Sequence, residues 1–180
     1  MGVRNYLIEG VSGAGKTTVA EELVRRRYHV IHGDRGFAYY GDPETGEPLD
    51  GPPHGTIRDN VTWGYAHWIW PVYKVKALID DRTHPITFFC GGSRNSYHFI
   101  DLFEEVFVLE VDLETLMERL ARRPDDEFGG RPIERDLITR RHGVKVDNPK
   151  NALFIDATAP VAQAVDKILS KCGEPDQAVR

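Results

Sequence analysis

The chain has 180 residues, of which 41% are hydrophobic and 28% are charged, and its net charge is −5. These values predict one globular domain, exclude intrinsic disorder as the main state, and argue against nucleic acid as a partner. No apolar run reaches the roughly 18 residues of a membrane span, so we expect no membrane partner. The only two cysteines, Cys90 and Cys172, exclude a disulfide framework and favour a reducing, cytoplasmic location.

Short apolar segments alternate with amphipathic segments along the chain, which predicts a parallel α/β sheet. We expect strands at residues 5–9, 29–32, 85–90, 106–111 and 152–155. We expect helices at 16–27, at 59–81 with a kink or interruption at Pro71, from the N-cap Asp112 to about 123, and at 160–171. Residues 41–55 contain four Gly and four Pro, which predicts a long loop.

Residues 10–17, GVSGAGKT, match the phosphate-loop pattern G-x-x-x-x-G-K-[ST] at every fixed position. The segment follows a predicted strand and opens a predicted helix, where backbone N–H groups and the helix N-terminus surround a phosphate. Lys16 is expected to reach the β- and γ-phosphates, and the Thr17 hydroxyl to bind Mg²⁺. This favours a nucleoside triphosphate site over a chance Gly-rich turn, and its binding residues are Gly10, Ser12, Gly13, Ala14, Gly15, Lys16, Thr17 and Thr18.

With this motif the chain resembles the P-loop small-molecule kinases of the adenylate-kinase and shikimate-kinase type. The resemblance spans nearly the whole chain and implies one kinase domain over residues 1–180, with a three-layer α/β/α fold, a five-stranded parallel sheet and an Arg-rich lid. It also implies ATP and Mg²⁺ as cofactors. No N-K-x-D motif for guanine occurs, and the D-x-x-G match at 126–129 follows an Arg-rich helix instead of a strand, so a GTPase is not favoured.

Seven arginines and no lysine lie between residues 119 and 141. They predict a mobile lid over about 119–142 that clamps the transferring phosphoryl group and bends at Pro124 and Gly129-Gly130. A solvated pair of helices with surface ion pairs is the alternative. The run Arg119-Leu120-Ala121-Arg122-Arg123 looks like the lid entry of adenylate-type kinases, which implies that Arg119 lies on the adenine and Arg123 on the phosphates.

The segment 156–160 leaves the last predicted strand and enters the last predicted helix. In the kinases that the chain resembles, this place lines the adenine with backbone, which implies that Ala157 and Thr158 contact the nucleotide. An ordinary capped turn explains the segment equally well.

Asp34 and its neighbour Arg35 follow the second predicted strand, beside the phosphate loop, at the edge where doubly wound sheets place ligands. A carboxylate there can orient and deprotonate an acceptor hydroxyl, or help to hold Mg²⁺ through water. In the shikimate-kinase type, an Asp at this strand end contacts the acceptor hydroxyl. A turn-forming Asp with an exposed Arg is the alternative.

Residues 90–95, CGGSRN, look like the D-G-x-P-R stretch of adenylate-type kinases, which implies that Arg94 binds the acceptor. Cys90 stands where that stretch has the Asp that supports Mg²⁺. Phe37 stands where the adenylate-kinase pattern G-D-x-x-R has its Arg, so one acceptor-phosphate contact is missing. An acceptor without a phosphate is therefore left open.

Residues 36–81 occupy the place of the acceptor-binding insertion in these kinases. Arg58 and Asp59 are expected to offer polar contacts at the entrance of its helix. Trp63, His67 and Trp70 share one face of that predicted helix, which forms either core or a stacking surface for a ring-bearing acceptor.

Together these features predict an ATP-dependent kinase that transfers the γ-phosphoryl group to a small molecule, with a nucleoside, nucleotide or related metabolite as the favoured acceptor. The expected catalytic residues are Lys16, Asp34 and Arg123, and the expected acceptor-binding residues are Asp34, Arg35, Arg58, Trp63 and Arg94. One alternative is a phosphotransferase that inactivates an antibiotic or another natural product. Another alternative is a nucleotide-binding regulatory module that hydrolyses ATP slowly.

Overall fold

A computed structural model describes residues 3–144, 149 and 151–173 of the chain. Its main sheet contains five parallel strands in the order β2-β5-β1-β6-β7. The predicted parallel sheet is confirmed, and each predicted strand end lies within one residue of the observed end. The strands are β1 (Arg4–Glu9), β2 (His29–His32), β5 (Ile86–Cys90), β6 (Glu105–Glu110) and β7 (Leu153–Asp156).

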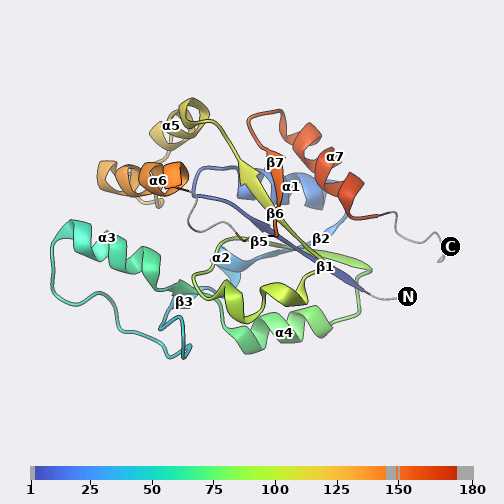
Figure 1. The fold of residues 1–180 in the computed structure, drawn as a ribbon, viewed down its shortest axis with the longest axis horizontal. Coiled ribbons are helices and arrows are strands. Elements are labelled where there is room, and N and C mark those ends of the chain that lie inside the picture. The colour runs from blue at the N-terminus through green and yellow to red at the C-terminus, as the bar shows by residue number, and fades with distance from the viewer. Residues whose placement is uncertain (1–2, 145–148, 150, 174–180) are drawn as a thin grey trace.

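Helices cover both faces of the sheet, which confirms the predicted three-layer architecture (Figure 1). One face carries α1 (Lys16–Arg25), α5 (Leu113–Ala121) and α7 (Val161–Lys171), and the other carries α4 (Val72–Asp80). Two short 3₁₀ helices, Ser96–His98 and Ile100–Leu102, follow β5. Within the described ranges, no helix is long and apolar enough to cross a membrane.

The two-residue period of the strands explains why one sheet supports two hydrophobic cores. Ile8 and Phe88 point into the core beneath α1, α5 and α7, whereas Leu7 and Phe89 point into the core beneath α4. All four side chains are fully buried, because helices shield the central strands β1 and β5 on both faces. This double burial is why the strands have nearly continuous apolar sequences.

The helix predicted for residues 59–81 is two helices, α3 (Ile57–Ala66) and α4, with the short strand β4 (Trp68–Ile69) between them. α3 begins at a capping box in which Thr56 and Asp59 each accept a hydrogen bond from the other's backbone N–H. β4 pairs antiparallel with β3 (Tyr39–Tyr40), and Pro71 is the N-cap of α4. The interruption expected at Pro71 is therefore confirmed.

Trp70 explains why the chain leaves the helix before Pro71. Its backbone N–H donates to Ser93 Oγ at 3.0 Å and to Asn95 Oδ1 at 3.1 Å, and the residue is 1% exposed in the core beneath α4. The expectation that Trp63, His67 and Trp70 share one helical face is wrong, because α3 ends at Ala66 and Trp70 packs in a different layer.

Asp112 is the N-cap of α5, as predicted, and its carboxylate accepts a hydrogen bond from the Thr115 N–H at 2.7 Å. Two further helices lie near the strand ends; the sequence analysis gave bounds to neither, although it named a pair of helices in the Arg-rich stretch as the alternative to a mobile lid. α2 (Gly33–Gly36) is a single turn, and α6 (Pro132–Val144) buries only Glu134, Leu137 and Ile138. Because α6 buries so few apolar side chains, its sequence shows only a weak helical periodicity of hydrophobic residues.

Gly33→Ala is expected to lower the free energy of unfolding by about 2 kcal/mol, because an added Cβ would lie 2.1 Å from the buried ring of Trp70. Gly36→Ala is the matched control, since a Cβ there has no neighbour within 4 Å in the same short helix. We expect the control to change stability by less than about 0.5 kcal/mol. Urea unfolding of both variants measures the difference, and equal midpoints would contradict this packing.

Candidate active site

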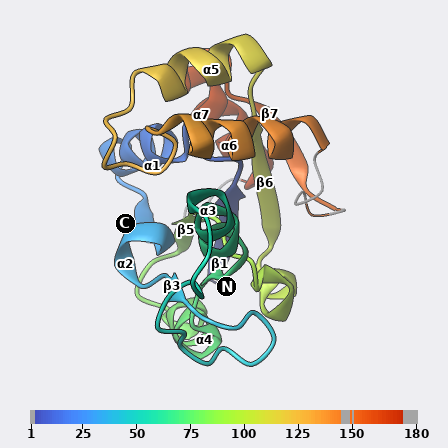
Figure 2. The ribbon, with the colours of Figure 1, turned by 90° about the vertical axis from the view of Figure 1, so that its left-hand side faces the viewer.

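The carboxyl ends of β1, β2 and β5 meet at one edge of the sheet, below α6 and behind α3 in Figure 2. The phosphate loop connects β1 to α1 at this edge. Gly10 and Gly13 have φ values of 149° and 96°, which L side chains rarely adopt. A Cβ would also lie 2.9 Å from Leu109 O at Gly10 and 2.8 Å from Leu116 Cδ1 at Gly13. The loop is therefore packed against β6 and α5 through its glycines.

Lys16 folds back over the phosphate loop. Its Nζ donates to Gly10 O at 2.6 Å and to Val11 O at 3.3 Å. Burial lowers the pKa of this ammonium group, and the negative charges of Asp34 and Glu9 oppose that shift. The ammonium group thus lies in the field of two carboxylates, Glu9 at the end of β1 and Asp34 after β2, two strands that β5 separates in the sheet.

A cavity of about 1130 Å³ lies beside the phosphate loop. Its wall includes every residue that the sequence analysis assigned to the nucleotide except Gly10, and also Arg123, Asp34 and Arg35. We name it the donor cavity. The nucleotide residues in its wall are Ser12, Gly13, Ala14, Gly15, Lys16, Thr17, Thr18, Arg119, Ala157 and Thr158.

Arg119 connects two parts of the donor cavity. Its guanidinium donates to Ala14 O in the phosphate loop at 3.1 Å and to Ala157 O after β7 at 2.8 Å. Arg119 therefore holds the phosphate loop and the segment after β7 at a fixed separation. The Arg119 side chain and the backbone of Ala157 lie together, as the resemblance to adenylate-type kinases implies.

Arg123 links the Arg-rich turn to the phosphate loop. Its Nη1 donates to Ser12 Oγ at 2.7 Å and also to Phe128 O, and Ser12 Oγ donates to Phe128 O at 3.3 Å. Burial lowers the pKa of the Arg123 guanidinium. The turn is closed further by Glu134, which accepts from the Gly129 N–H at 2.8 Å and from Arg131 Nε at 2.9 Å. The Arg-rich segment after α5 is thus in contact with the phosphate loop.

Asp34 projects from α2 toward the end of β5, which is the neighbour of β2 in the sheet. Its Oδ1 accepts from the Gly92 N–H at 3.1 Å and from Trp68 Nε1 at 3.3 Å. These two donors come from residues far apart in the sequence, so the carboxylate has one fixed orientation. Asp34 also belongs to the walls of two cavities.

A second cavity, of about 550 Å³, opens on the other side of Lys16, and we name it the acceptor cavity. One stripe of α3 forms part of its wall, with residues at helical spacing: Ile57, Asn60, Val61, Gly64 and Tyr65. Tyr40, Trp68, Gly92 and Arg94 lie in the same wall. The donor and acceptor cavities share four residues, which are Ser12, Lys16, Asp34 and Phe128. The two cavities therefore meet at the phosphate loop.

Glu9 is a site residue that the sequence analysis missed. It is the last residue of β1, it is 7% exposed, and it lies in the wall of the acceptor cavity. Burial raises its pKa to about 7, although the charges of Arg94 and Lys16 act in the opposite direction. The sequence signal was an acidic residue at the end of an otherwise apolar strand, immediately before the phosphate loop.

Arg94, Tyr65 and Arg141 form a cluster between α3, α6 and the end of β5. Arg94 Nη1 donates to the Tyr65 hydroxyl at 3.0 Å, and the guanidinium groups of Arg94 and Arg141 lie 4.5 Å and 5.0 Å from the centre of the Tyr65 ring. Arg58 lies outside the acceptor cavity and donates to Asp136 of α6 at 2.9 Å. These contacts join α3 to α6.

Trp63 and Arg35 also lie outside the acceptor cavity. Trp63 stacks on His67, with ring centres 4.4 Å apart, and packs beside Tyr40. Arg35 is exposed in the wall of the donor cavity. Of the five residues that the sequence assigned to the acceptor, only Asp34 and Arg94 contribute to the acceptor cavity.

Oxygen donors suited to Mg²⁺ lie at the donor cavity, where Thr17 carries a hydroxyl and Asp34 a carboxylate. Mg²⁺ at nucleotide sites is held by one or two such oxygens together with substrate phosphates and water, so these residues fit the ion. In the part of the chain that the structure describes, no cluster of three or more His, Cys, Asp or Glu residues is placed to hold a metal. Burial raises the pKa of the Cys90 thiol to about 12, so this side chain stays protonated and does not replace a carboxylate.

The raised pKa of Glu9 predicts a pH-dependent stability. The folded protein keeps this proton up to about pH 7, whereas the unfolded chain loses it near pH 4.5, so folding loses stability as the pH rises through that window. We expect Glu9→Gln to gain about 3 kcal/mol relative to the wild type between pH 4.5 and 8. Urea unfolding across this range measures the gain, with the exposed α1 variant Glu21→Gln as control. If the difference in the free energy of unfolding between Glu9→Gln and wild type stayed constant over this pH range, the raised pKa of Glu9 would be wrong.

No protein-family model matches the chain, and no curated protein matches its sequence. Solved structures do match its fold. A sugar kinase from Janibacter sp. HTCC2649 is 16% identical, with a TM-score of 0.55 and 93% of each chain covered. A gluconokinase from Sinorhizobium meliloti 1021 is 20% identical, with a TM-score of 0.53 and 93% of this chain and 90% of the other covered.

A deoxyadenosine kinase from M. mycoides, solved with bound dATP, is 15% identical, with a TM-score of 0.55 and 93% of this chain and 98% of the other covered. The three similarities cover nearly the whole chain. They are similarities of backbone fold, because few residues are identical. Together with the phosphate loop, they establish that the chain has the fold of the P-loop small-molecule kinases.

Proposed function

We propose that the protein is a cytoplasmic ATP-dependent kinase that transfers the γ-phosphoryl group to a hydroxyl of a small molecule, with a nucleoside, a nucleotide or a related metabolite as acceptor. The observation that carries this proposal is the meeting of two cavities at Ser12, Lys16, Asp34 and Phe128. A kinase must bind two substrates so that the attacking oxygen and the γ-phosphorus come close together. A module that only hydrolyses ATP has no need of the second cavity.

Lys16 and Arg123 are the cationic residues of the transfer. Lys16 donates to Gly10 O and Val11 O, and Arg123 donates to Ser12 Oγ and Phe128 O. A triphosphate in the donor cavity offers anionic oxygens that replace these neutral acceptors and form stronger bonds. Both side chains then stabilise the charge that spreads over the transferring group.

Asp34 and Glu9 are the carboxylates of the acceptor side. The bond between the acceptor oxygen and the γ-phosphorus forms while the bond to the β-phosphate oxygen breaks, and the hydroxyl proton passes to a carboxylate. Asp34 has a fixed orientation beside Lys16, which suits it to orient and deprotonate the hydroxyl. Glu9, whose pKa is about 7, is a second group able to accept that proton near neutral pH.

When bound, Mg²⁺ would supply positive charge to the phosphates. Thr17 would hold the ion with its hydroxyl and Asp34 with its carboxylate, directly or through water, since both residues line the donor cavity. Asp34 can act either as a ligand of Mg²⁺ or as the base for the acceptor hydroxyl. The Mg²⁺ dependence of the Asp34→Asn variant, described below, distinguishes these two roles.

The test of the function is ADP release from ATP in the presence of nucleosides, nucleotides, sugars, gluconate and aminoglycosides. We expect one compound class to accelerate release, and Lys16→Ala to lower kcat by roughly 10²-fold or more, since a transition-state phosphate contact is lost. Lys167→Ala, on the exposed surface of α7, is the control and should keep wild-type activity. Release that responds to no acceptor would favour the regulatory ATPase, and acceleration by aminoglycosides alone would favour the antibiotic phosphotransferase.

Asp34→Asn is expected to lower kcat by at least about 10²-fold, with the affinity for ATP nearly unchanged, because the amide keeps the shape but loses the charge. The exposed variant Asp101→Asn serves as control. Steady-state turnover and equilibrium ATP binding on one preparation decide the matter. A kcat within a few-fold of wild type would make Asp34 a turn residue only, and a shifted Mg²⁺ requirement would assign its charge to the ion.

Arg119 and Arg123 are expected to act on different kinetic constants. Arg119→Ala should mainly raise the KM for ATP, since Arg119 connects Ala14 and Ala157 around the donor cavity, and the effect should be about 1 kcal/mol. Arg123→Ala should mainly lower kcat, because charge on the transferring group is greatest in the transition state. Arg122→Ala, whose side chain is 81% exposed, is the matched control. If all three variants behave alike, the Arg-rich segment is only a solvated surface.

A further inference from the structure

Arg35 is a basic residue whose place in the structure differs from the role that the sequence suggested. It was expected to bind the acceptor, but it lies in the wall of the donor cavity and outside the acceptor cavity. The residue is exposed, and within the described residues no hydrogen bond or ion pair engages its guanidinium group. The five N–H donors of this group are therefore available to a ligand in the donor cavity.

The backbone at Arg35 is held in place by close packing. Arg35 is the third residue of α2, the single turn that begins at Gly33. A Cβ at Gly33 would lie 2.1 Å from the Trp70 ring, and the next residue, Asp34, accepts from the Gly92 N–H at 3.1 Å. Both contacts fix α2 against the sheet, so the Arg35 side chain starts from a fixed point beside the donor cavity.

Arg35 and Arg123 bring two positive charges together. Burial lowers the pKa of the Arg123 guanidinium, the charge of Glu127 opposes that shift, and the charge of Arg35 adds to it. The two guanidinium groups are thus close enough to repel each other, and both residues belong to the wall of one cavity. Two cations that converge on a cavity are unfavourable alone and favourable when an anion lies between them.

The four residues at which the two cavities meet indicate which anion this is. Arg123 donates to two of them, Ser12 Oγ at 2.7 Å and Phe128 O. Arg35 is the chain neighbour of a third, Asp34. In a transfer between the cavities, the γ-phosphoryl group lies at this junction, because it is bonded to the donor while the acceptor attacks it. The two arginines therefore flank the place where the γ-phosphoryl group is transferred.

We propose that Arg35 is a catalytic residue that binds the γ-phosphoryl group of the donor together with Arg123, and that it does not bind the acceptor. The inference rests on the proposed kinase function and adds a third cation to Lys16 and Arg123. A planar guanidinium group donates two parallel hydrogen bonds to phosphate oxygens, which suits Arg35 to this contact. Its charge then stabilises the negative charge that spreads over the transferring group.

Equilibrium binding of two nucleotides tests which phosphate Arg35 contacts. In the presence of Mg²⁺, we expect Arg35→Ala to bind the non-hydrolysable ATP analogue AMP-PNP about 10-fold more weakly than the wild type, as loss of a charge-assisted hydrogen bond implies. ADP has no γ-phosphoryl group, so its affinity should change by less than about two-fold, because a charge without a direct contact is screened. Isothermal titration calorimetry measures both affinities. Equal losses for the two nucleotides, or no loss for either, would overturn the assignment to the γ-phosphoryl group.

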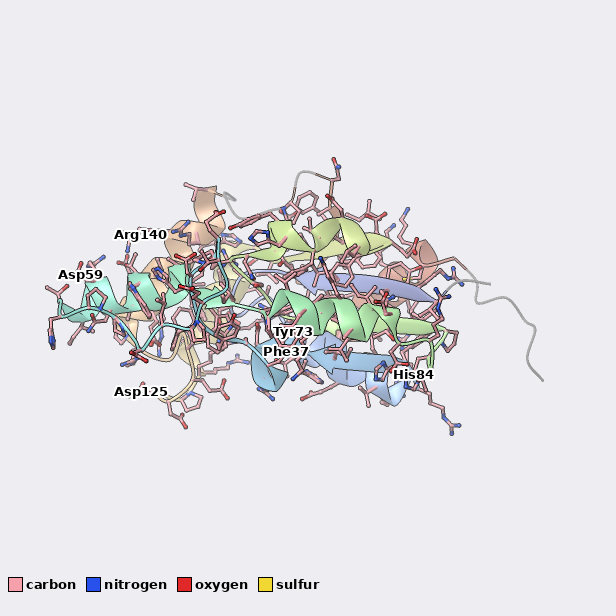
Figure 3. All side chains as sticks on the ribbon, turned by 90° about the horizontal axis from the view of Figure 1, so that it is seen from below. Phe37, Asp59, Tyr73, His84, Asp125 and Arg140 are labelled. Atoms are coloured by element: carbon pink, nitrogen blue, oxygen red, sulfur yellow. The ribbon has the colours of Figure 1, made fainter. Side chains whose placement is uncertain are left out.

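Arg82→Ala is the matched control, since it removes the same charge from an exposed residue that lines neither cavity. Arg82 precedes His84 by two residues. In Figure 3 His84 lies at the opposite end of the molecule from Asp125, whose two successors along the chain line the donor cavity. We expect Arg82→Ala to bind both nucleotides like the wild type. If it lost as much affinity for AMP-PNP as Arg35→Ala, net charge would explain the effect and the direct contact would be wrong.

Arg35→Lys tests whether the geometry of the guanidinium group matters as well as its charge. Lysine keeps the charge but donates from a single nitrogen, so we expect it to recover only part of the affinity for AMP-PNP that Arg35→Ala loses. Recovery no better than that of Arg35→Ala would still agree with a paired hydrogen bond to phosphate. Affinity above the wild-type value would contradict it.

Turnover separates a contact with the γ-phosphoryl group from a contact with the acceptor. With the best acceptor among the nucleosides, nucleotides, sugars, gluconate and aminoglycosides tested above, Arg35→Ala should lower kcat by at least about 10-fold and leave the KM for that acceptor nearly unchanged. A raised acceptor KM with unchanged kcat would return Arg35 to the acceptor. If the wild type binds AMP-PNP but transfers to none of these compounds, the kinase function fails, whereas the difference between AMP-PNP and ADP still tests the contact of Arg35.

Discussion

The burial of one indole ring organises the acceptor side of the molecule. A Cβ at Gly33 would lie 2.1 Å from the Trp70 ring and a Cβ at Gly91 would lie 2.6 Å from it, so both backbones are in direct contact with the ring. Asp34 follows the first of these glycines and Gly92 follows the second, and their hydrogen bond joins the ends of β2 and β5 directly beside the ring. The orientation of a carboxylate proposed for catalysis thus depends on close packing that tolerates no added atom.

The backbone of the same residue, Trp70, fixes the segment that follows the end of α3. The Trp70 backbone N–H and C=O bond to the Ser93 and Asn95 side chains, and the Arg94 N–H bonds to Trp68 O at 2.9 Å. Because of these bonds, residues 68–70 do not continue the backbone hydrogen-bond pattern of α3. The same bonds place Arg94 next to Tyr65 of α3. One buried residue therefore determines where α3 ends and which of its faces lines the acceptor cavity.

Opposite charges hold the centre of the site together. Lys16, Asp34 and Glu9 come from α1, α2 and β1, and each carboxylate raises the pKa of the lysine that burial lowers. Burial makes such interactions stronger than at the surface, and it also makes an unpaired charge costly. In the proposed mechanism, a triphosphate that binds Lys16 removes positive charge from around Glu9, whose pKa burial already raises to about 7.

The sequence by itself determined the parts of the protein that depend on neighbours along the chain. The strand and helix periods, the Asp112 cap and the phosphate loop with Lys16 and Thr17 are local patterns, and the strand ends it predicted lie within one residue of those observed. The resemblance at the lid entry assigned Arg119 to the adenine and Arg123 to the phosphates, and both side chains lie in the wall of the donor cavity.

Only the tertiary structure decided which side chains share a cavity. Glu9 looked like an ordinary residue before a loop, but burial in β1, between β5 and β6, raises its pKa to about 7. Arg58 and Trp63 have the right chemistry for an acceptor, but they pack against α6 and His67 instead. The physical reason is that burial and pairing are properties of contacts between distant segments, and a linear pattern contains neither.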